Sequence, residues 1–306
     1  MSKMAFRLGE EFCARIAGFR RPMYLVAHHD DEIPTAGLLQ RLGPRTRVVW
    51  MTNSDGLYTE SKLTPAEYGE LRKAEGIKSV GVVGIAPGDT RCLDFSEVEI
   101  YRRMGWLHSG ERSIDQVKPF FDEIRDAVRR EVFEARPDVV FTQAWQGGMP
   151  EHDLVHFFTV LAVADYCRES GEKVEVLHLP AYEYTILIAM RFHPLYRGTR
   201  IRIRLTPEEM ARKLAMVEAY PSQVRLFGDF RRVFKYAGVL GRPFGGPRTI
   251  EEFLAVEEFG PVPDAIDYAA KPHLLDFFTY MFDDFEGEPV TFKKSVRPIV
   301  RAYLER

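Results

Sequence analysis

The sequence predicts an α/β protein in which a mostly parallel β-sheet carries helices on both faces. Short apolar segments typical of buried strands alternate with segments of helical period over the first two-thirds of the chain. The turns between these segments are short and polar. Ionisable residues also follow directly after apolar segments, and parallel sheets bind ligands beyond the carboxyl ends of their strands.

The expected elements follow from local patterns in chain order. Up to residue 179 they are a strand at 23–27, a helix at 35–42, a strand at 47–52, helices at 64–80 and 114–135, a strand at 137–142, a helix at 154–167 and a strand at 174–177. The helix after Thr64 has the clearest start, because Pro65 suits the first helical position and Glu67 is placed for a capping box.

The pattern changes after residue 179. Residues 182–189 and 201–205 are predicted strands, and a helix is expected over 207–220. The Gly- and Pro-rich segment 238–263 is expected to be an ordered loop or linker. Residues 96–116 are expected to be irregular and to form a lid that sets substrate choice.

Composition excludes several classes of protein. The 306 residues are 45% hydrophobic and 28% charged, as in soluble globular proteins, and suffice for one large α/β domain with additions. A net charge of -3 gives no reason to expect nucleic acid or an anionic membrane as partner. No apolar run spans a bilayer, no secretory signal is apparent, and three cysteines without CxxC spacing make neither a disulfide framework nor a thiolate metal site. We therefore expect a cytoplasmic protein, which could be a homo-oligomer.

The most informative segment is residues 27–32, Ala-His-His-Asp-Asp-Glu, directly after the first predicted strand. Adjacent carboxylates repel each other unless they are solvated, paired or bound to a cation, and a divalent metal suits a site that also offers two imidazoles. A solvated acidic cap for the helix at 35–42, with incidental histidines, is the alternative. The strand context and a distant histidine-containing turn at residues 147–153 favour the metal site.

The spacing assigns roles within this candidate site. A hydrolytic zinc ion typically takes three protein ligands and keeps one position open for water. His28 and Asp31 are close enough to face one cation, and His152 is the best third ligand. Asp30 is then free to accept the proton of the attacking water as general base.

These residues resemble the signatures of the PIG-L/LmbE family of zinc-dependent N-deacetylases, which act mostly on N-acetylglucosamine-containing molecules. The family's Ala-His-Pro-Asp-Asp-Glu aligns with residues 27–32, and its Gly-Gly-His-Pro-Asp-His-Asp aligns with residues 147–153. Weaker matches are an Arg-x-x-Glu helix at residues 70–75 and a Ser-Gln element at 220–223. The likeness extends over about residues 22–225.

The resemblance implies a zinc cofactor, an amino-sugar substrate and a Rossmann-like core. We expect this LmbE-like core over 1–190 and a C-terminal extension, 191–306, packed on the core rather than forming an independent domain. The implied ligands are His28, Asp31 and His152, with Asp30 as general base. The expected activity is removal of an N-acetyl group from an N-acetylglucosamine-type sugar or conjugate. Hydrolysis of another N-acyl amide, and a metal-retaining carbohydrate-binding protein with little turnover, are the alternatives.

Two departures from the signatures bear on catalysis. Met149 replaces a histidine that in the family helps to stabilise the oxyanion, a donor of the kind that is worth about 3 kcal/mol. His29 replaces a proline, and we favour the hypothesis that its imidazole supplies the missing donor. Glu151 keeps a carboxylate near the site but moves it by one methylene.

Further candidates have a structural alternative each. Arg72 is expected either to bind substrate hydroxyls or to form an exposed ion pair with Glu75. Asp55 either hydrogen-bonds a sugar or belongs to a polar turn, which we favour. Trp145 either stacks on a sugar or packs in the core. His156, one turn after His152, is expected to be a packed histidine rather than a ligand.

Overall fold

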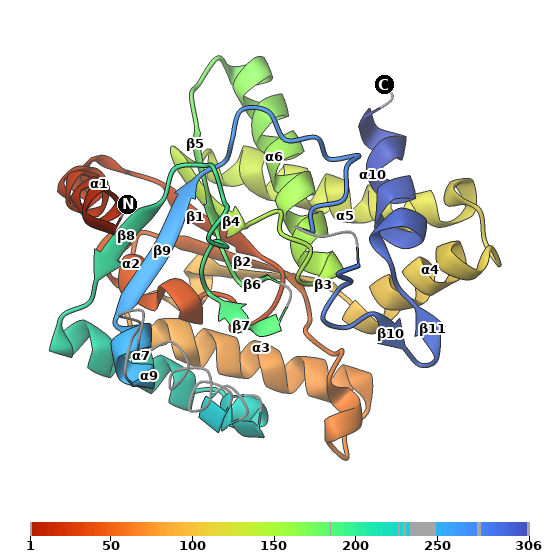
Figure 1. Cartoon of the computed structure of the whole chain (residues 1–306), viewed down its shortest axis with the longest axis horizontal. Helices are drawn as coiled ribbons and strands as arrows, with labels where there is room; N and C mark the ends of the chain where they lie inside the picture. The colour runs from red at the N-terminus through yellow and green to blue at the C-terminus, as the bar shows by residue number, and fades with distance from the viewer. Residues whose placement is uncertain are drawn as a thin grey trace.

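The chain folds into a layered α/β structure, seen here in a computed structural model (Figure 1). The structure describes residues 2–183, 185–225, 227–228, 231–232, 249–273 and 277–304. The strands are β1 (Pro22–Val26), β2 (Arg47–Thr52), β3 (Thr90–Phe95), β4 (Val139–Gln143), β5 (Glu175–Leu179), β6 (Tyr182–Glu183), β7 (Thr185–Ala189), β8 (Ile201–Arg204), β9 (Val256–Pro261), β10 (Asp284–Phe285) and β11 (Glu288–Pro289).

Helices lie between the strands. They are α1 (Ser2–Arg15), α2 (Ala36–Leu42), α3 (Pro65–Gly81), α4 (Glu97–Ser109), α5 (Ile114–Ala135), α6 (Pro150–Ser170), α7 (Pro207–Glu218), α9 (Ile250–Leu254) and α10 (Arg297–Leu304). Single turns of 3-10 helix include η2 (Ile33–Thr35), η3 (Tyr58–Glu60) and η5 (Pro221–Gln223), and a π-helical turn, Phe292–Val296, precedes α10. In the described part of the chain, no helix is long and apolar enough to cross a membrane.

The central sheet is mostly parallel. Its strand order is β3-β2-β1-β4-β5-β9-β8, in which the first five strands run parallel and β9 is antiparallel to both β5 and β8. The chain leaves β1 towards β2 on one side, whereas β4 lies on the other side of β1. Sheets of this kind bind ligands beside the strand ends where the order reverses. The loops after β1 and β4 are therefore placed to form a site together.

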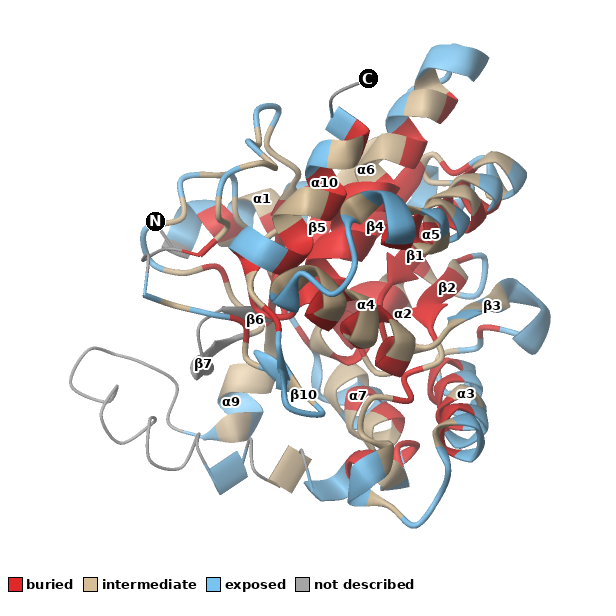
Figure 2. Cartoon of the chain, turned by 90° about the vertical axis from the view of Figure 1, so that its right-hand side faces the viewer, coloured by how far each residue is buried: buried red, intermediate tan, exposed pale blue. Residues whose placement is uncertain are grey.

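The sheet has an apolar layer on each face. Alternate residues of β1 point to opposite sides: Met23 and Leu25 pack among α4, α5, α6 and α10, whereas Tyr24 and Val26 pack among α1, α2 and α7. Figure 2 shows the buried residues on the strands and on the helix faces turned towards them. The fold is thus the predicted mostly parallel sheet with helices on both faces.

Most predicted elements are present with small shifts at their ends. The capping box expected at Thr64 forms, since the Thr64 side chain accepts from the Glu67 N–H and the Glu67 carboxylate accepts from the Thr64 N–H. Helix α6 begins at Pro150, four residues before the predicted start, so His152 lies in its first turn. The periodicity of hydrophobic residues does not predict this helix start, because the first turn of α6 carries polar residues that face the site.

Two predictions about irregular segments were wrong. Residues 97–109 of the expected lid form helix α4, whose N-terminus is capped by Ser96, and α4 packs on the core through Ile100 and Met104. Within the expected loop 238–263, α9 and strand β9 occur, and residues 238–248 lie outside the described residues. The composition of β9 does not predict a strand. The segment forms one because it pairs with β5 and β8, which supply its backbone hydrogen bonds.

The C-terminal part of the chain contributes to the sheet and to its helical cover. β8 and β9 extend the sheet beyond β5, and α10 joins the apolar layer beneath α5 and α6. The expected strand at 182–189 is an antiparallel pair, β6 and β7, with residue 184 outside the described residues. The division at residue 190 stays a prediction.

Candidate metal centre

The turn after β1 holds the first half of the site. The Asp31 N–H donates to the His28 carbonyl (3.2 Å), and the His28 N–H donates to the Asp31 carboxylate (2.6 Å). These reciprocal bonds close the turn and direct both side chains to the same side. His28 and Asp31 are both 7% exposed. The turn therefore places His28 and Asp31, three residues apart in the sequence, where both can bind one cation.

The second half of the site comes from the loop between β4 and α6. Asp153 anchors this loop, because its carboxylate accepts from the N–H groups of Gln146 (3.2 Å) and Gly147 (3.1 Å) and from the Tyr280 hydroxyl (3.0 Å). Burial raises the pKa of Asp153 to about 7 despite these donors. His152, the residue before this anchor, projects from the first turn of α6 towards β1.

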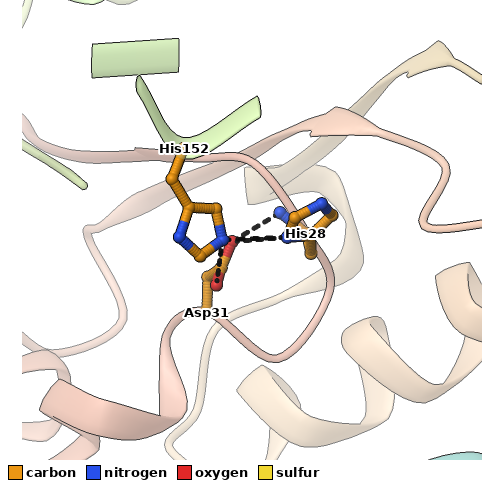
Figure 3. A group of neighbouring side chains, drawn as sticks. All are labelled: His28, Asp31 and His152. Atoms are coloured by element: carbon orange, nitrogen blue, oxygen red, sulfur yellow. Dashed lines mark hydrogen bonds and ion pairs between the residues drawn. The ribbon is translucent and has the colours of Figure 1, made fainter. Parts of the chain in front are cut away.

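His28, Asp31 and His152 converge although 121 residues separate the last two in the sequence (Figure 3). His28 Nδ1 lies 3.0 Å from His152 Nε2, and the Asp31 carboxylate oxygens lie 3.4 Å and 3.2 Å from these two atoms. Ligand atoms around a tetrahedral zinc ion lie roughly 3.4 Å apart. The spacing and the two-imidazole, one-carboxylate donor set thus fit a zinc-type cation.

The other nitrogen of His28 faces two further carboxylates. His28 Nε2 lies 3.1 Å from Glu151 and 3.7 Å from Glu97. A carboxylate that accepts from Nε2–H leaves Nδ1 with a free lone pair and orients the ring for metal binding. Tyr101 donates to the same Glu151 oxygen (3.2 Å). Glu151 and Glu97 therefore place negative charge beside the nitrogen of His28 that faces away from His152.

Asp30 lies beside this group and is held by Arg72. The Arg72 guanidinium donates to the Asp30 carboxylate (2.8 Å) and to the His29 carbonyl, and is itself almost fully buried. Asp30 has φ of 112°, a left-handed conformation that costs a non-glycine residue free energy. One guanidinium nitrogen of Arg72 thus joins the His29 carbonyl to the Asp30 carboxylate and stabilises this strained turn.

The Arg-x-x-Glu element of α3 and the Ser-Gln element of η5 contact each other next to Asp30. Arg72 contacts Glu75 (3.3 Å) and Ser222 (3.2 Å), and Ser222 donates to the Glu75 carboxylate (2.6 Å). The alternative of an exposed ion pair is wrong about exposure, since the Arg72–Glu75 pair forms but is buried because α7 and η5 cover this face of α3. Both residues belong to the buried support of the site.

Burial and neighbouring charges shift the pKa values of the site. Burial disfavours the imidazolium of His28, but Glu97 and Asp31 outweigh that effect and raise its pKa well above the usual value. Burial opposes ionisation of Asp31, yet His152 and His28 lower its pKa. Burial raises the pKa of Asp30 although Arg72 acts against it, and burial raises the pKa of Glu97 to about 7. Asp31 is thus kept as an anion, while Asp30 is made more basic.

An open cavity of about 90 Å³ lies over the candidate centre. Its polar lining includes His28, Asp30, Asp31, Ser54, Arg72, Glu97, Gln223 and Asp284. Its apolar lining includes Leu57, Tyr101, Met149, Met281, Phe282 and Phe285. Arg72 and Met149, two predicted substrate-binding residues, therefore face the cavity.

The structure places His29 away from this cavity. Its ring stacks on Trp50 with 4.5 Å between ring centroids, and Nδ1 lies 2.9 Å from the Ser54 hydroxyl. Burial, and next the charge of Arg72, lower the pKa of His29 well below its usual value. The hypothesis that His29 replaces the missing oxyanion donor is therefore not supported, because the turn directs successive side chains to opposite sides.

Asp55 and Trp145 also lie outside the cavity lining. The Asp55 carboxylate accepts from the Ser96 hydroxyl (2.7 Å) and the Val98 N–H (3.1 Å), so it fastens the start of α4. Trp145 packs against Tyr268 and Phe292, with ring centroids 5.0 Å and 6.0 Å away. The contacts favour the structural alternative for both residues.

His156 is fully buried one turn after His152. Its Nδ1 lies 2.7 Å from the Gln143 carbonyl and its Nε2 lies 3.0 Å from the Tyr268 hydroxyl. Both nitrogens therefore bind groups within the fold. The expectation of a packed histidine agrees with these contacts.

Burial lowers the pKa of His156 to about 4 from the usual 6.5. Between these values the unfolded chain binds a proton that the folded protein does not, so this stabilisation is complete above pH 6.5 and decreases as the pH falls towards 4. Relative to His156→Gln, wild type should lose about 2 kcal/mol between pH 7.5 and 4.5. Urea unfolding of both proteins at the two pH values measures this difference. An equal difference at both pH values would contradict it.

Several residues that line the cavity were not predicted from the sequence. Glu97 lies at the start of α4, in the segment expected to be irregular, and the Ser96 cap was its one local signal. Met281, Phe282 and Phe285 come from the C-terminal part, where no motif stands out. They reach the cavity because the Met281 N–H donates to the Gly148 carbonyl (2.8 Å) in the loop that precedes His152.

The fold and this site define an α/β protein with a candidate metal-binding group. The model of the PIG-L family, described as GlcNAc-PI de-N-acetylase, matches residues 23–163, which confirms the resemblance seen in the sequence. A search of curated protein sequences gave no match.

Solved structures with a similar fold include several deacetylases. A deacetylase from the teicoplanin biosynthesis pathway has 22% identity and a TM-score of 0.57, covering 81% of this chain and 99% of that protein. A zinc-inhibited form of teicoplanin deacetylase has 21% identity and a TM-score of 0.56, covering 81% and 99%. N,N'-diacetylchitobiose deacetylase from Pyrococcus horikoshii has 15% identity and a TM-score of 0.52, covering 84% and 91%.

Proposed function

We propose that this protein is a zinc-dependent hydrolase that removes the N-acyl group, with N-acetyl as the reference case, from an N-acetylglucosamine-type amino sugar or its conjugate. The convergence of His28, Asp31 and His152 beside the Asp30 carboxylate carries the proposal. The family match and the deacetylase fold support it.

The residues present have the chemistry that amide hydrolysis needs. Zinc, when bound by His28, Asp31 and His152, supplies Lewis-acid polarisation of the amide carbonyl and makes water more acidic. Asp30 accepts a proton from the water whose oxygen adds to the carbonyl carbon. As the carbon–nitrogen bond breaks, Asp30 returns that proton to the leaving nitrogen, and the products are a carboxylate and an amine. Arg72 fixes the position of Asp30 for both transfers.

A screen for acyl release tests the proposal. Zinc-loaded protein is incubated with N-acetylglucosamine conjugates of varied aglycone, and free acetate and free amine are both measured. We expect stoichiometric release of the two products from at least one conjugate. Zinc binding without release from any N-acylated sugar would favour the alternative of a metal-retaining carbohydrate-binding protein.

Met149 is the residue whose substitution best distinguishes the proposed hydrolase from the alternative carbohydrate-binding protein. It lines the cavity, and its thioether donates no hydrogen bond to a developing oxyanion. Since His29 faces Trp50, we expect Met149→His to raise kcat on an N-acetyl substrate about tenfold or more. Steady-state kinetics of wild type and variant measure this effect. An unchanged or lower kcat would show that another group already donates there.

A further inference from the structure

One wall of the cavity is apolar. Tyr101 from α4, Met149 from the start of α6, and Met281, Phe282 and Phe285 from the C-terminal segment line it. Phe282 is 38% exposed, so part of this apolar side chain faces solvent at the cavity. Of these residues, only Tyr101 and Met149 fall within the family match at 23–163. The remaining three make the wall a feature of this chain's C-terminal part.

The apolar wall is held in place by specific contacts. The Tyr280 hydroxyl donates to Asp153 (3.0 Å), and the Met281 N–H donates to the Gly148 carbonyl, so this segment is joined to the loop carrying His152. The ring of Phe285 lies 5.3 Å from that of Tyr101. The turn between β10 and β11 is fastened by Tyr58, which donates to Glu286 (3.0 Å). These contacts therefore fix the position of the apolar lining relative to the candidate metal centre.

Most of the polar lining comes from other elements, although Glu97 of α4 and Asp284 of β10 also line the cavity. Arg72 projects from α3 and Gln223 from η5, and Arg72 binds the Asp30 carboxylate. In the proposed hydrolysis the leaving nitrogen receives its proton from Asp30, so the amino sugar must lie on the Asp30 and Arg72 side. The acyl chain extends from the carbonyl carbon in the other direction, towards the apolar wall.

We infer that the preferred substrate carries an N-acyl group that is longer and more apolar than acetyl, and that this acyl chain packs on Met149, Met281 and Phe285. This inference rests on the proposed amide hydrolysis and names its acyl specificity. It also gives a physical reason for Met149, because a thioether makes good contacts with an alkyl chain where an imidazole would not. The bond broken and the proton transfers are those described above.

A series of N-acylglucosamines with acetyl, butyryl, hexanoyl and octanoyl chains tests acyl specificity, with free glucosamine as the common product. For wild-type zinc-loaded protein, kcat/KM should rise about two- to fourfold per methylene up to hexanoyl. In Phe282→Ala and Phe285→Ala, the ratio of hexanoyl to acetyl kcat/KM should fall about tenfold. Phe277→Ala is the matched control, because Phe277 is 75% exposed, lies in the same segment and does not line the cavity.

Calorimetry separates this inference from the proposed function. Zinc-loaded Asp30→Asn protein is titrated with N-hexanoylglucosamine and N-acetylglucosamine, so binding is measured without turnover. At least tenfold tighter binding of the hexanoyl compound supports the apolar acyl site, even if no compound is hydrolysed by wild type. Equal or weaker binding of the hexanoyl compound overturns it, even if wild type hydrolyses the acetyl compound.

Discussion

His152→Ala should abolish stoichiometric metal binding and reduce amide hydrolysis to background. The variant removes one of three converging ligand atoms and leaves the buried Asp31 carboxylate without its imidazole partner at 3.2 Å. Loss of a residue that merely orients a ligand costs 10- to 100-fold in metal affinity, so loss of a ligand should cost more than about 100-fold. Wild type should bind about one zinc per chain, measured by elemental analysis after dialysis. His28→Ala and Asp31→Ala should behave in the same way.

His156→Gln is the matched control for His152→Ala. His156 lies one turn further along α6 and is also buried, but it contacts the Gln143 carbonyl and Tyr268 rather than Asp31. It should keep the metal at pH 7.5. Full metal retention by His152→Ala would show that the two distant motifs do not share one ion.

Asp30→Asn should keep the metal and lose hydrolysis by a factor of about 100 to 10,000. An amide has nearly the size of a carboxylate, so the strained turn can persist, but it accepts no proton from water. Burial raises the pKa of Asp30, which makes the wild-type carboxylate a better base than an exposed one. The measurement is kcat on an accepted N-acyl substrate together with metal content.

Metal content and unfolding temperature serve as internal controls for Asp30→Asn. Loss of both activity and zinc would assign Asp30 to metal binding or to folding rather than to proton transfer. Unchanged kcat with full metal content would remove Asp30 from the mechanism altogether. Because Arg72 also donates to the His29 carbonyl, the turn has a second point of support in the variant.

Local sequence patterns were sufficient for most strands of the sheet, although not for β3 and β9, and for the two halves of the candidate metal site. Strand β2 and helix α5 have the predicted bounds, since each combines a clear period with a clear start. His28 and Asp31 are brought together by a turn of four residues, a short-range event that composition and spacing encode.

Long-range packing decided the rest. Glu97 reaches His28 because α4 forms on the core, where Ile100 and Met104 are buried, and that burial overrides a sequence with little helical signal. His29 turns towards Trp50 although it stands between two site residues, because adjacent side chains of a turn point in different directions.

The sequence by itself thus determined the fold class, the placing of His28 and Asp31 after β1, and the presence of a distant histidine suited to join them. Only the tertiary structure decided that Arg72 is a buried support of Asp30 and that Met281, Phe282 and Phe285 form apolar lining of the cavity. The physical reason is one of range. Turns and periodic faces depend on residues a few positions apart, whereas the walls of a cavity depend on backbone contacts between segments more than 100 residues apart, such as Gly148 and Met281.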